Sequence, residues 1–401
     1  MSTSTPIPNP GDVIPHFQPI LTMDTQRIFA YEVLGRWQTP QGTRSLGPFF
    51  HDPFISTEDH IRIDRIIRQK AIAALAKAPE DTRLFLNLKP NWIYSFRDHP
   101  EKLPTLQFLR EHNVDPSRFT VEITEDSFND DIEDLARVTQ TYREAGCQIA
   151  IDDVGSGFIN FDRIAYIKPN ILKLDLELVK KCTREDFFKE VLASFANTAE
   201  KIGASLLFEG IETEEEVQIA LSLGARYLQG YFFAKPYDEF LSPDVFHHCL
   251  SYQIRQFVDH ALWETHSDQR ASDALRNSLL ECLPRWPEGT DPRWRKADEF
   301  ILRFLDSLPR LVSRVYLCDE RGYQYSSNFT RHHGEWITEE EFRGRNWAWR
   351  PYFLNNIVKA TYKETGKLSS TYTDAHSGCK MRTYIYPAGD ELFLCLDLCI
   401  D

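Results

Sequence analysis

The sequence lacks a surplus of positive charge. Its 401 residues include 46 Lys and Arg against 60 Asp and Glu, which gives a formal net charge of −14. General binding to DNA or RNA requires a basic surface that neutralises phosphates, so we expect no nucleic-acid polymer as a partner. If this acidic chain handles a phosphate, positive charge must be supplied locally, by a metal ion or by a few well-placed Arg and Lys side chains.

Cysteine pairs, long apolar runs and targeting signals are also missing. The eight cysteines include no C-x-x-C pair and no spacing typical of zinc sites, so we interpret them as reduced thiols of a cytosolic protein. No apolar run approaches the roughly 20 residues of a membrane helix, and the N-terminus has neither a basic start nor an apolar stretch. We therefore expect a cytoplasmic protein without a membrane span.

Seven short apolar runs each end on a residue that can bind a metal or handle a proton or phosphate. The runs are rich in Val, Ile, Leu and Phe, which is typical of strands buried on both faces. The residues at or beside their ends are Glu32, Asn87, Glu122, Asp152 with Asp153, Lys173, Glu209 and Gln229. In a barrel of parallel strands such ends converge on one rim, where the loops build the active site.

Strand-like runs alternate with amphipathic helical stretches from His16 to about Pro236, the pattern of repeated βα units. Glycines follow three helical stretches where a left-handed cap is favoured, and a T-x-x-E capping box opens the last helix. These residues are Gly146, Gly203, Gly224, Thr213 and Glu216. About eight strands result, so we predict an α/β fold, a TIM-like (β/α)8 barrel, over residues 1–241.

The remainder of the chain predicts two further parts. Residues 242–308 are mostly helical, with a break at Leu283–Pro292, and suit a helical connector. Residues 309–401 are strand-rich, with turns near Gly322 and Gly378. They predict a small antiparallel sheet that carries a few helices, an α+β domain.

Several motifs follow one another in a fixed order along the predicted barrel. They are Glu32-Val33-Leu34, Asn87, Glu122 with Glu125, Asp152-Asp153 before Gly155-Ser156-Gly157, Lys173 with Asp175, Glu209-Gly210, and Gln229-Gly230-Tyr231. With this set, residues from about 12 to 240 resemble the EAL domain, a barrel that hydrolyses the bacterial second messenger cyclic di-GMP. The connector and C-terminal part further resemble the YkuI type of EAL protein, which carries a PAS-like or Cache-like sensor domain.

The resemblance implies a metal-dependent phosphodiesterase that converts cyclic di-GMP to linear 5′-pGpG and is regulated by the sensor domain. It implies two ions, Mg²⁺ or Mn²⁺, with Ca²⁺ inhibitory, and oxygen ligands without histidine suit such ions. The residues that would hold the first ion are Glu32, Asn87, Glu122 and Asp152, and those for the second are Asp152 and Asp153. Lys173 would act on the nucleophilic water or the developing charge, and Glu209 would belong to the same catalytic region.

The same resemblance assigns roles beside the ions. Arg36, on the first βα loop, would bind a phosphate of the ligand, because a guanidinium fork fits phosphate oxygens; a surface salt bridge is the alternative. Gln229 and Asp175 would also contact the ligand, and Glu125 would brace the loop that follows the aspartate pair. If Asp152 and Asp153 stood alone, the simpler interpretation would be that they cap the loop ahead of a helix.

Departures from the family pattern keep a second function open. Val154 and Ser156 replace an aromatic residue and a threonine, and Gly35 in place of leucine could loosen the loop that presents Arg36. The alternative is a catalytically weak or inactive EAL protein that serves as a cyclic di-GMP receptor; an inert barrel used as a dimer scaffold is a third. All predicted metal ligands and Lys173 are retained, which favours the enzyme.

A homodimer is expected from the loop between Val154 and Phe161. This loop carries a further apolar residue, Phe158, at a rim otherwise rich in charge. Grouped apolar side chains near a polar site often mark a protein contact, and the family dimerises through this region.

The C-terminal domain offers a possible site for an unknown small ligand. The aromatic residues Trp347, Trp349, Tyr352 and Phe353 surround Arg350 in sequence. They either line a pocket for an anionic or amino-acid-like ligand or pack a helix onto the sheet. Both alternatives are compatible with the pattern.

Overall fold

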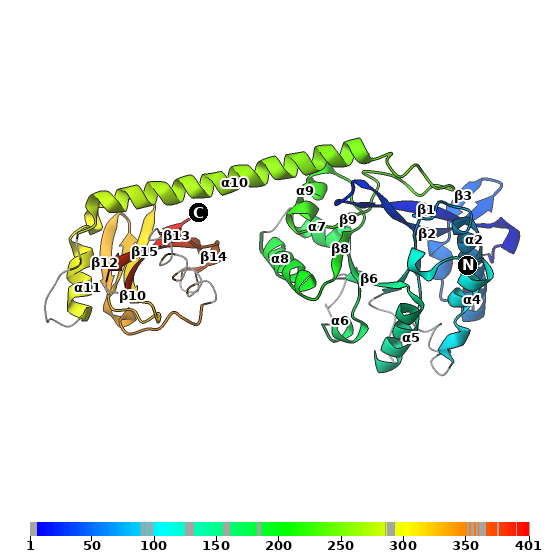
Figure 1. Cartoon of the computed structure of the whole chain (residues 1–401), viewed down its shortest axis with the longest axis horizontal. Helices are drawn as coiled ribbons and strands as arrows, with labels where there is room; N and C mark the ends of the chain where they lie inside the picture. The colour runs from blue at the N-terminus through cyan, green and yellow to red at the C-terminus, as the bar shows by residue number, and fades with distance from the viewer. Residues whose placement is uncertain are drawn as a thin grey trace. The chain divides into compact units, whose positions relative to one another are not determined.

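The structure is a computed structural model of the chain, which forms two compact units, Met1–Asp259 and His260–Asp401 (Figure 1). It describes residues 6–89, 92, 96, 99–124, 132–154, 161–182, 186–284, 286, 293–350, 353, 357, 360, 366–374, 377–389 and 391–400. Among these residues no helix is long and apolar enough to cross a membrane.

The first unit contains a closed barrel. Its strands are β1 (Val13–Thr22), β2 (Arg27–Thr39), β3 (Gly42–Ser45), β4 (Leu84–Asn87), β5 (Phe119–Thr124), β6 (Gln148–Val154), β7 (Ile171–Leu174), β8 (Ser205–Phe208) and β9 (Tyr227–Leu228). The strand order within the described residues is β1-β9-β8-β7-β6-β5-β4-β2-β3, and pairing of β1 with β2 closes the ring. The predicted TIM-like barrel is confirmed.

One strand departs from the all-parallel barrel that the sequence predicted. β1 runs antiparallel to both of its neighbours, β2 and β9, whereas the strands from β2 through β4 to β9 are parallel. The reason is the short turn at residues 23–26 between β1 and β2, which is too short for the crossover that parallel neighbours need. Beyond the barrel wall, β2 continues into a hairpin with β3.

Helices surround the barrel (Figure 1). They are η1 (Pro10–Asp12), α1 (Gly47–Phe50), α2 (Thr57–Leu75), η3 (Pro100–Lys102), α4 (Pro104–Glu111), η4 (Pro116–Arg118), α5 (Ile132–Ala145), α6 (Phe161–Ile167), α7 (Leu176–Cys182), α8 (Asp186–Lys201) and α9 (Glu214–Ser222). The predicted capping box at α9 is confirmed by reciprocal hydrogen bonds between Thr213 and Glu216. Positive φ angles at Gly146, Gly203 and Gly224 confirm the predicted left-handed caps.

Alternation along the strands determines which side chains enter the barrel. A small apolar cluster, separate from the larger core between strands and helices, consists of Ile20, Ala30, Phe85, Ala150, Ile171, Leu207 and Tyr227. Strand side chains alternate with period two, so a residue two positions further along points to the same side. Two positions beyond these residues toward the carboxyl ends of the parallel strands lie Glu32, Asn87, Asp152, Lys173, Glu209 and Gln229. The apolar layer therefore forms the floor under the predicted site.

The second unit is built on an antiparallel sheet. Its strands are β10 (Val312–Asp319), β11 (Asn328–His332), β12 (Glu335–Glu339), β13 (Lys367–Leu368), β14 (Tyr372–Thr373), β15 (Lys380–Gly389) and β16 (Leu392–Cys399). The order is β12-β11-β10-β16-β15-β13, with β14 also paired to β15. The helical elements are α10 (His247–Cys282), which begins in the first unit, α11 (Arg293–Leu302), η6 (Leu305–Ser307) and η7 (Glu340–Phe342).

Both faces of this sheet are covered. Along β16, Leu392, Leu394, Leu396 and Leu398 join a core with residues of α10 and α11, whereas Phe393 and Cys395 join a second core with Trp347 and Phe353. Trp349 is exposed, and the Arg350 guanidinium lies 4.7 Å from the centre of the Trp347 ring. Tyr352 lies outside the described residues. Packing onto the sheet thus accounts for two of the four predicted aromatic residues.

Candidate active site

The seven parallel strands each supply one of the residues predicted at strand ends. Glu32 lies within β2, Asn87 ends β4, and Glu122, Asp152 and Lys173 lie in β5, β6 and β7. Glu209 and Gln229 directly follow β8 and β9. Their backbone N–H groups continue the ladder, because Glu209 donates to the Leu174 carbonyl (3.1 Å) and Gln229 to the Phe208 carbonyl (2.9 Å).

Lys173 lies at the centre of these side chains and is completely buried, with 0% exposure. Its Nζ is 2.8 Å from Asp152 Oδ1, 2.9 Å from Glu122 Oε1, 3.1 Å from Glu209 Oε2 and 4.0 Å from Glu32 Oε1. Burying an ammonium is costly unless opposite charges surround it. Four carboxylates from four strands do so here, and the closed barrel is what brings them together.

Two of the carboxyl groups around Lys173, those of Glu122 and Glu209, have raised pKa values. Burial raises the pKa of Glu122 well above its ordinary value; Lys173 opposes the shift, and neighbouring Glu32 and Asp152 add to it. Burial likewise raises the pKa of Glu209. Burial alone would lower the pKa of Lys173, but the carboxylates, led by Asp152, outweigh it and hold the pKa well above its ordinary value. The surrounding carboxylates therefore favour the ammonium form of Lys173.

Two amide side chains donate hydrogen bonds to Glu32. Gln229 donates through Nε2 to Glu32 Oε2 at 2.6 Å, and Asn87 donates through Nδ2 to Glu32 Oε1 at 3.4 Å. Both amides thus point their nitrogens at Glu32. Their oxygens remain available to another partner.

The residues fit a divalent cation that prefers oxygen ligands. Carboxylate oxygens of Asp152, Asp153 and Glu209 lie within 4.8 Å of one another. Within the described part of the chain, the buried atoms Asn87 Oδ1, Gln229 Oε1 and Glu122 Oε2 accept no hydrogen bond. Buried acceptors without a donor are rare and costly, and a bound cation would satisfy them. The structure thereby brings Glu209 into the cluster that the sequence assigned to Asp152 and Asp153.

Asp153 lies at an irregularity within β6, where the pairing register with β7 shifts between Ile151 and Val154. Its φ angle is 58°, in the left-handed region that Asp occupies more readily than most residues. Its N–H donates to Asp152 Oδ1 at 3.1 Å. This conformation places the carboxylates of consecutive residues together, although strand neighbours would ordinarily point to opposite faces.

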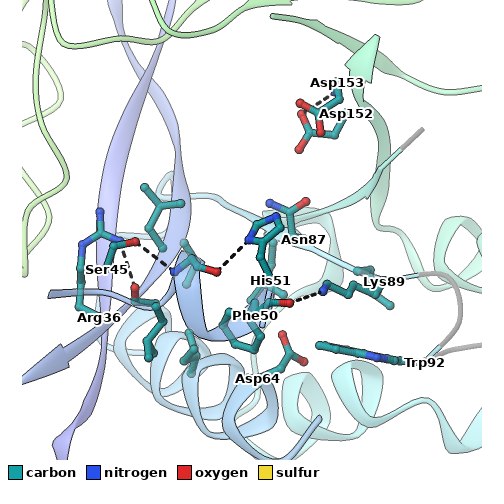
Figure 2. A pocket seen from close by; sticks show the side chains of 18 residues that line it. Arg36, Ser45, Phe50, His51, Asp64, Asn87, Lys89, Trp92, Asp152 and Asp153 are labelled. Atoms are coloured by element: carbon teal, nitrogen blue, oxygen red, sulfur yellow. Dashed lines mark hydrogen bonds between the residues drawn. The ribbon is translucent and has the colours of Figure 1, made fainter. Parts of the chain in front are cut away.

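A cavity of about 330 Å³ opens beside this cluster (Figure 2). Figure 2 shows Asn87, Asp152 and Asp153 on one side of the cavity and Arg36 on another, with Lys89 and Trp92 on a third. Arg36 is half-buried, and burial lowers its pKa, an effect that Tyr231 and Glu32 oppose. A guanidinium remains charged under these conditions, so the cavity has a cation opposite the carboxylate cluster.

Arg36 lies on a strand, and the predicted placement on a loop is wrong. It belongs to β2 and pairs with Ile14 of β1 and Ser45 of β3. The prediction that Gly35 loosens a loop is also wrong, because Gly35 lies in the same strand. A Cβ at Gly35 would approach Ile67 Cδ1 to 2.5 Å, so close packing against α2 explains the glycine better.

A second hollow, of about 290 Å³, is lined in part by Glu32, Glu209 and Gln229. It includes Asp175, whose Oδ1 accepts from the N–H of Glu177 at 2.7 Å at the start of α7. It also includes Gln18 of β1, a buried residue that sequence reasoning missed. Gln18 pairs with Glu32 across the hairpin and lies two positions before Ile20. In an antiparallel strand the residue at the site comes before the apolar run instead of after it. A polar residue just before an apolar run is therefore the signal that could have identified Gln18.

The remaining predicted residues either fall outside the described part of the chain or belong to the predicted contact between EAL domains. Glu125 and Phe158, with residues 155–160, fall outside the described residues. Val154 is buried at the end of β6, so the prediction that it contributes to an exposed contact is wrong; strand pairing with Leu174 explains its position. Phe161 begins α6 and is 60% exposed.

Comparison with known proteins agrees with this geometry. The family model of the EAL domain matches residues 8–236. The chain belongs to the EAL-domain family. A second model, of an EAL-domain associated signalling protein domain, matches residues 240–401. The EAL domain thus coincides with the barrel, and the second match contains the whole C-terminal sheet.

One relative is similar over nearly the full chain, and another over the EAL domain. An uncharacterised EAL-domain containing protein of Bacillus subtilis, YkuI, is 35% identical over 393 residues, covering 97% of this chain and 95% of that protein. The crystal structure of YkuI in complex with substrate c-di-GMP and calcium has a TM-score of 0.90 at 34% identity and covers 98% of both chains. The cyclic di-GMP phosphodiesterase RocR of Pseudomonas aeruginosa is 30% identical over 240 residues, 57% of this chain and 58% of RocR. The resemblance to the YkuI type is confirmed.

Proposed function

We propose that this EAL protein is a metal-dependent phosphodiesterase that hydrolyses cyclic di-GMP to linear 5′-pGpG. The observation that carries the proposal is Lys173, completely buried and ion-paired to carboxylates of several strands, beside buried oxygens without hydrogen-bond donors. A site with these features can combine metal ligands with a charged proton donor. The relatives whose names include cyclic di-GMP support the choice of substrate.

The ligand set is proposed from the donors on the strand ends. The first ion would be held by Glu32, Asn87, Glu122 and Asp152, and the second by Asp152 and Asp153, with Glu209 beside them. Two such ions, Mg²⁺ or Mn²⁺, would lower the pKa of a coordinated water and neutralise negative charge on the reacting phosphate. Ca²⁺ is expected to allow binding but to inhibit turnover, because it is larger and tolerates looser geometry.

Protein groups would orient the substrate and move protons. Lys173 keeps its proton among the carboxylates and would donate hydrogen bonds to the attacking water and to the developing negative charge. Arg36 would bind a phosphate across the cavity, and Gln229 and Asp175 would contact the ligand from the second hollow. Glu125 would brace the loop after Asp153.

The proposal extends to assembly and regulation. We propose a homodimer in which the exposed Phe161 takes part in the contact between EAL domains. The parts 1–241, 242–308 and 309–401 would act as catalytic barrel, helical connector and sensor, and the sensor would bind a small ligand near Arg350. Light scattering at micromolar concentration tests the dimer, and a monomeric protein would contradict it.

An assay of the purified full chain tests the proposed activity. Cyclic di-GMP is incubated with Mg²⁺, Mn²⁺ or Ca²⁺, and products are separated by chromatography. We expect linear 5′-pGpG with Mg²⁺ or Mn²⁺ and intact cyclic di-GMP with Ca²⁺. Binding of cyclic di-GMP without any product in all three metals would instead establish the receptor function.

A further inference from the structure

An arginine occupies a core position of α2. The buried residues of this helix are Arg68 and the apolar residues Ile63, Ile67, Ala71, Ile72 and Leu75. Arg68 is only 4% exposed. A guanidinium is rarely buried to this degree without paired hydrogen-bond acceptors, so its position requires an explanation beyond helix packing.

Arg68 connects three elements through its guanidinium. Its Nη2 donates to Asp64 Oδ2 at 2.6 Å, one turn earlier in α2, and to the backbone carbonyl of Asn87 at 3.3 Å. Its Nη1 donates to Thr105 Oγ1 in α4 at 2.8 Å. The planar fork of a guanidinium can hold three acceptors in a fixed arrangement, which a lysine ammonium on a flexible stem does less well.

The contact with Asn87 is the one that reaches the active site. Asn87 is the last residue of β4, and its side-chain Oδ1 is one of the buried oxygens that accept no hydrogen bond from described residues. Among the described residues, its Nδ2 donates a single long hydrogen bond, to Glu32 at 3.4 Å. Fixing the Asn87 backbone therefore limits where this oxygen can lie at the point where the strand ends.

The contact with Asp64 affects the cavity. Asp64 lies in the cavity wall that also contains Asn87 and Lys89 (Figure 2). Without Arg68, its carboxylate would lose the guanidinium that it pairs with at 2.6 Å. An unpaired carboxylate facing the cavity would repel an anionic ligand.

We infer that Arg68 is a positioning residue for the metal site: it holds Asn87 in place for an ion and keeps Asp64 neutralised. The inference rests on the proposed function for its role in catalysis, but metal binding tests it independently. Partners that orient metal ligands typically contribute about 10- to 100-fold to metal affinity or activity.

The test measures Mn²⁺ binding to the full chain by electron paramagnetic resonance, in parallel with hydrolysis of cyclic di-GMP. Arg68→Met should weaken Mn²⁺ binding about 10- to 100-fold, and excess Mn²⁺ should recover part of the lost rate. Arg65→Met is the matched control, because Arg65 is exposed on the same helix. This variant should bind Mn²⁺ with the affinity of the wild type.

Two further variants separate positioning from stability. The double variant Asp64→Asn/Arg68→Met leaves neither charge of this pair without its partner. Its melting temperature should therefore be higher than that of Arg68→Met alone, whereas its Mn²⁺ binding should stay weak. Arg68→Lys keeps the charge and is expected to fold, yet it should still bind Mn²⁺ several-fold more weakly because the fork is lost.

Each outcome decides the inference. Equal Mn²⁺ affinity in Arg68→Met, Arg68→Lys and the control would overturn it, as would a wild type that binds no Mn²⁺. A wild type that binds Mn²⁺ without hydrolysing cyclic di-GMP would end the proposed enzymatic function, and the affinity of the Arg68 variants would still decide the positioning role.

Discussion

At the scale of single residues, Lys173 explains why so many carboxylates can share one end of a barrel. Its Nζ lies within 3.1 Å of oxygens from Asp152, Glu122 and Glu209. This ammonium offsets part of the cost of burying their negative charge. With metal ions bound, the same ammonium would be available to the reacting water and phosphate.

Replacing Lys173 by methionine tests this division of roles. Methionine fills similar space without charge, so the rate of cyclic di-GMP hydrolysis should fall by about 10²-fold or more, the scale of a lost electrostatic or acid–base group. Affinity for cyclic di-GMP, measured by calorimetry in Ca²⁺, should change far less. The melting temperature in Mn²⁺ shows whether the variant is folded.

Arg36→Ala provides the opposite case. Arg36 lies across the cavity from the aspartate pair, so its loss should chiefly weaken binding of the ligand. The rate at saturating cyclic di-GMP should fall less than in Lys173→Met. An equal loss of affinity in both variants would contradict the separation of binding from chemistry.

At the scale of elements, most of the site followed from one property of the sequence. Apolar runs that end on Glu32, Asn87, Glu122, Asp152 and Lys173 predicted parallel strands, and parallel strands bring their carboxyl ends together. The strand direction of β1 could not be read from the same pattern, because the pattern does not show whether a short turn leads into a hairpin. Gln18 was missed for that reason.

Other errors arose from tertiary packing. The predicted loop position of Arg36 is wrong because pairing with β3 extends β2 to Thr39. The predicted loop position of Val154 is wrong because this residue still pairs within the sheet with Leu174. The contacts of Arg68 could not be predicted from the sequence either, because they join α2, α4 and the end of β4, which are distant in the chain.

Gly230 offers a test of how closely the last strand end is packed. A Cβ at this position would lie 2.1 Å from the carbonyl oxygen and 2.2 Å from the nitrogen of Ile211. Gly230→Ala should therefore lower the free energy of unfolding by about 3 kcal/mol, the upper range for overpacking, because backbone must move. Activity should fall as well, since Gln229 is the preceding residue.

Chemical denaturation measures this effect. Gly11→Ala is the matched control, because nothing lies within 4 Å of the added Cβ, and its change should stay within about 0.5 kcal/mol. If both variants were equally stable, the close approach between Gly230 and Ile211 would be disproved.

At the scale of the whole molecule, the two units bury charge in different ways. The barrel concentrates carboxylates around Lys173, whereas the C-terminal unit pairs Arg314 with Asp374 at 3.3 Å and with Asp397 at 3.2 Å. Asp374 also accepts from the backbone N–H and the hydroxyl of Ser377. The first cluster retains buried oxygens without hydrogen-bond donors and suits chemistry. In the second cluster both carboxylates are ion-paired to Arg314, although Arg314 Nε itself donates no hydrogen bond among the described residues, and this pairing suits a structural role.

The second cluster predicts a dependence of stability on pH. Burial opposes ionisation of Asp374, but hydrogen bonds from Arg314 and Ser377 outweigh it and lower the pKa of Asp374 to about 2, from 3.8. A carboxyl whose folded pKa is depressed stabilises the fold above its unfolded pKa and loses that contribution as pH falls through the folded pKa. The stabilisation should therefore be complete above about pH 4 and decline toward pH 2.

Asp374→Asn checks this expectation. Denaturant unfolding of the full chain should show the wild type to be more stable than the variant at pH 6, with the difference narrowing as pH falls below about 4. Unfolding is followed by tryptophan fluorescence, to which the buried Trp347 of the C-terminal unit contributes. A difference that stays constant down to pH 2.5 would mean that Asp374 is not held as a carboxylate.

The proposed function requires this EAL protein to add water to a phosphodiester by means of its carboxylate cluster and Lys173. Mass spectrometry of the product formed from cyclic di-GMP in ¹⁸O-labelled water with Mn²⁺ shows whether this addition takes place. We predict linear 5′-pGpG with one ¹⁸O in its terminal phosphate, and none from Asp152→Asn, which lacks the shared ligand. Intact cyclic di-GMP after prolonged incubation with the wild type would rule out this hydrolysis, and equal labelled product from Asp152→Asn would rule out Asp152 as the shared metal ligand.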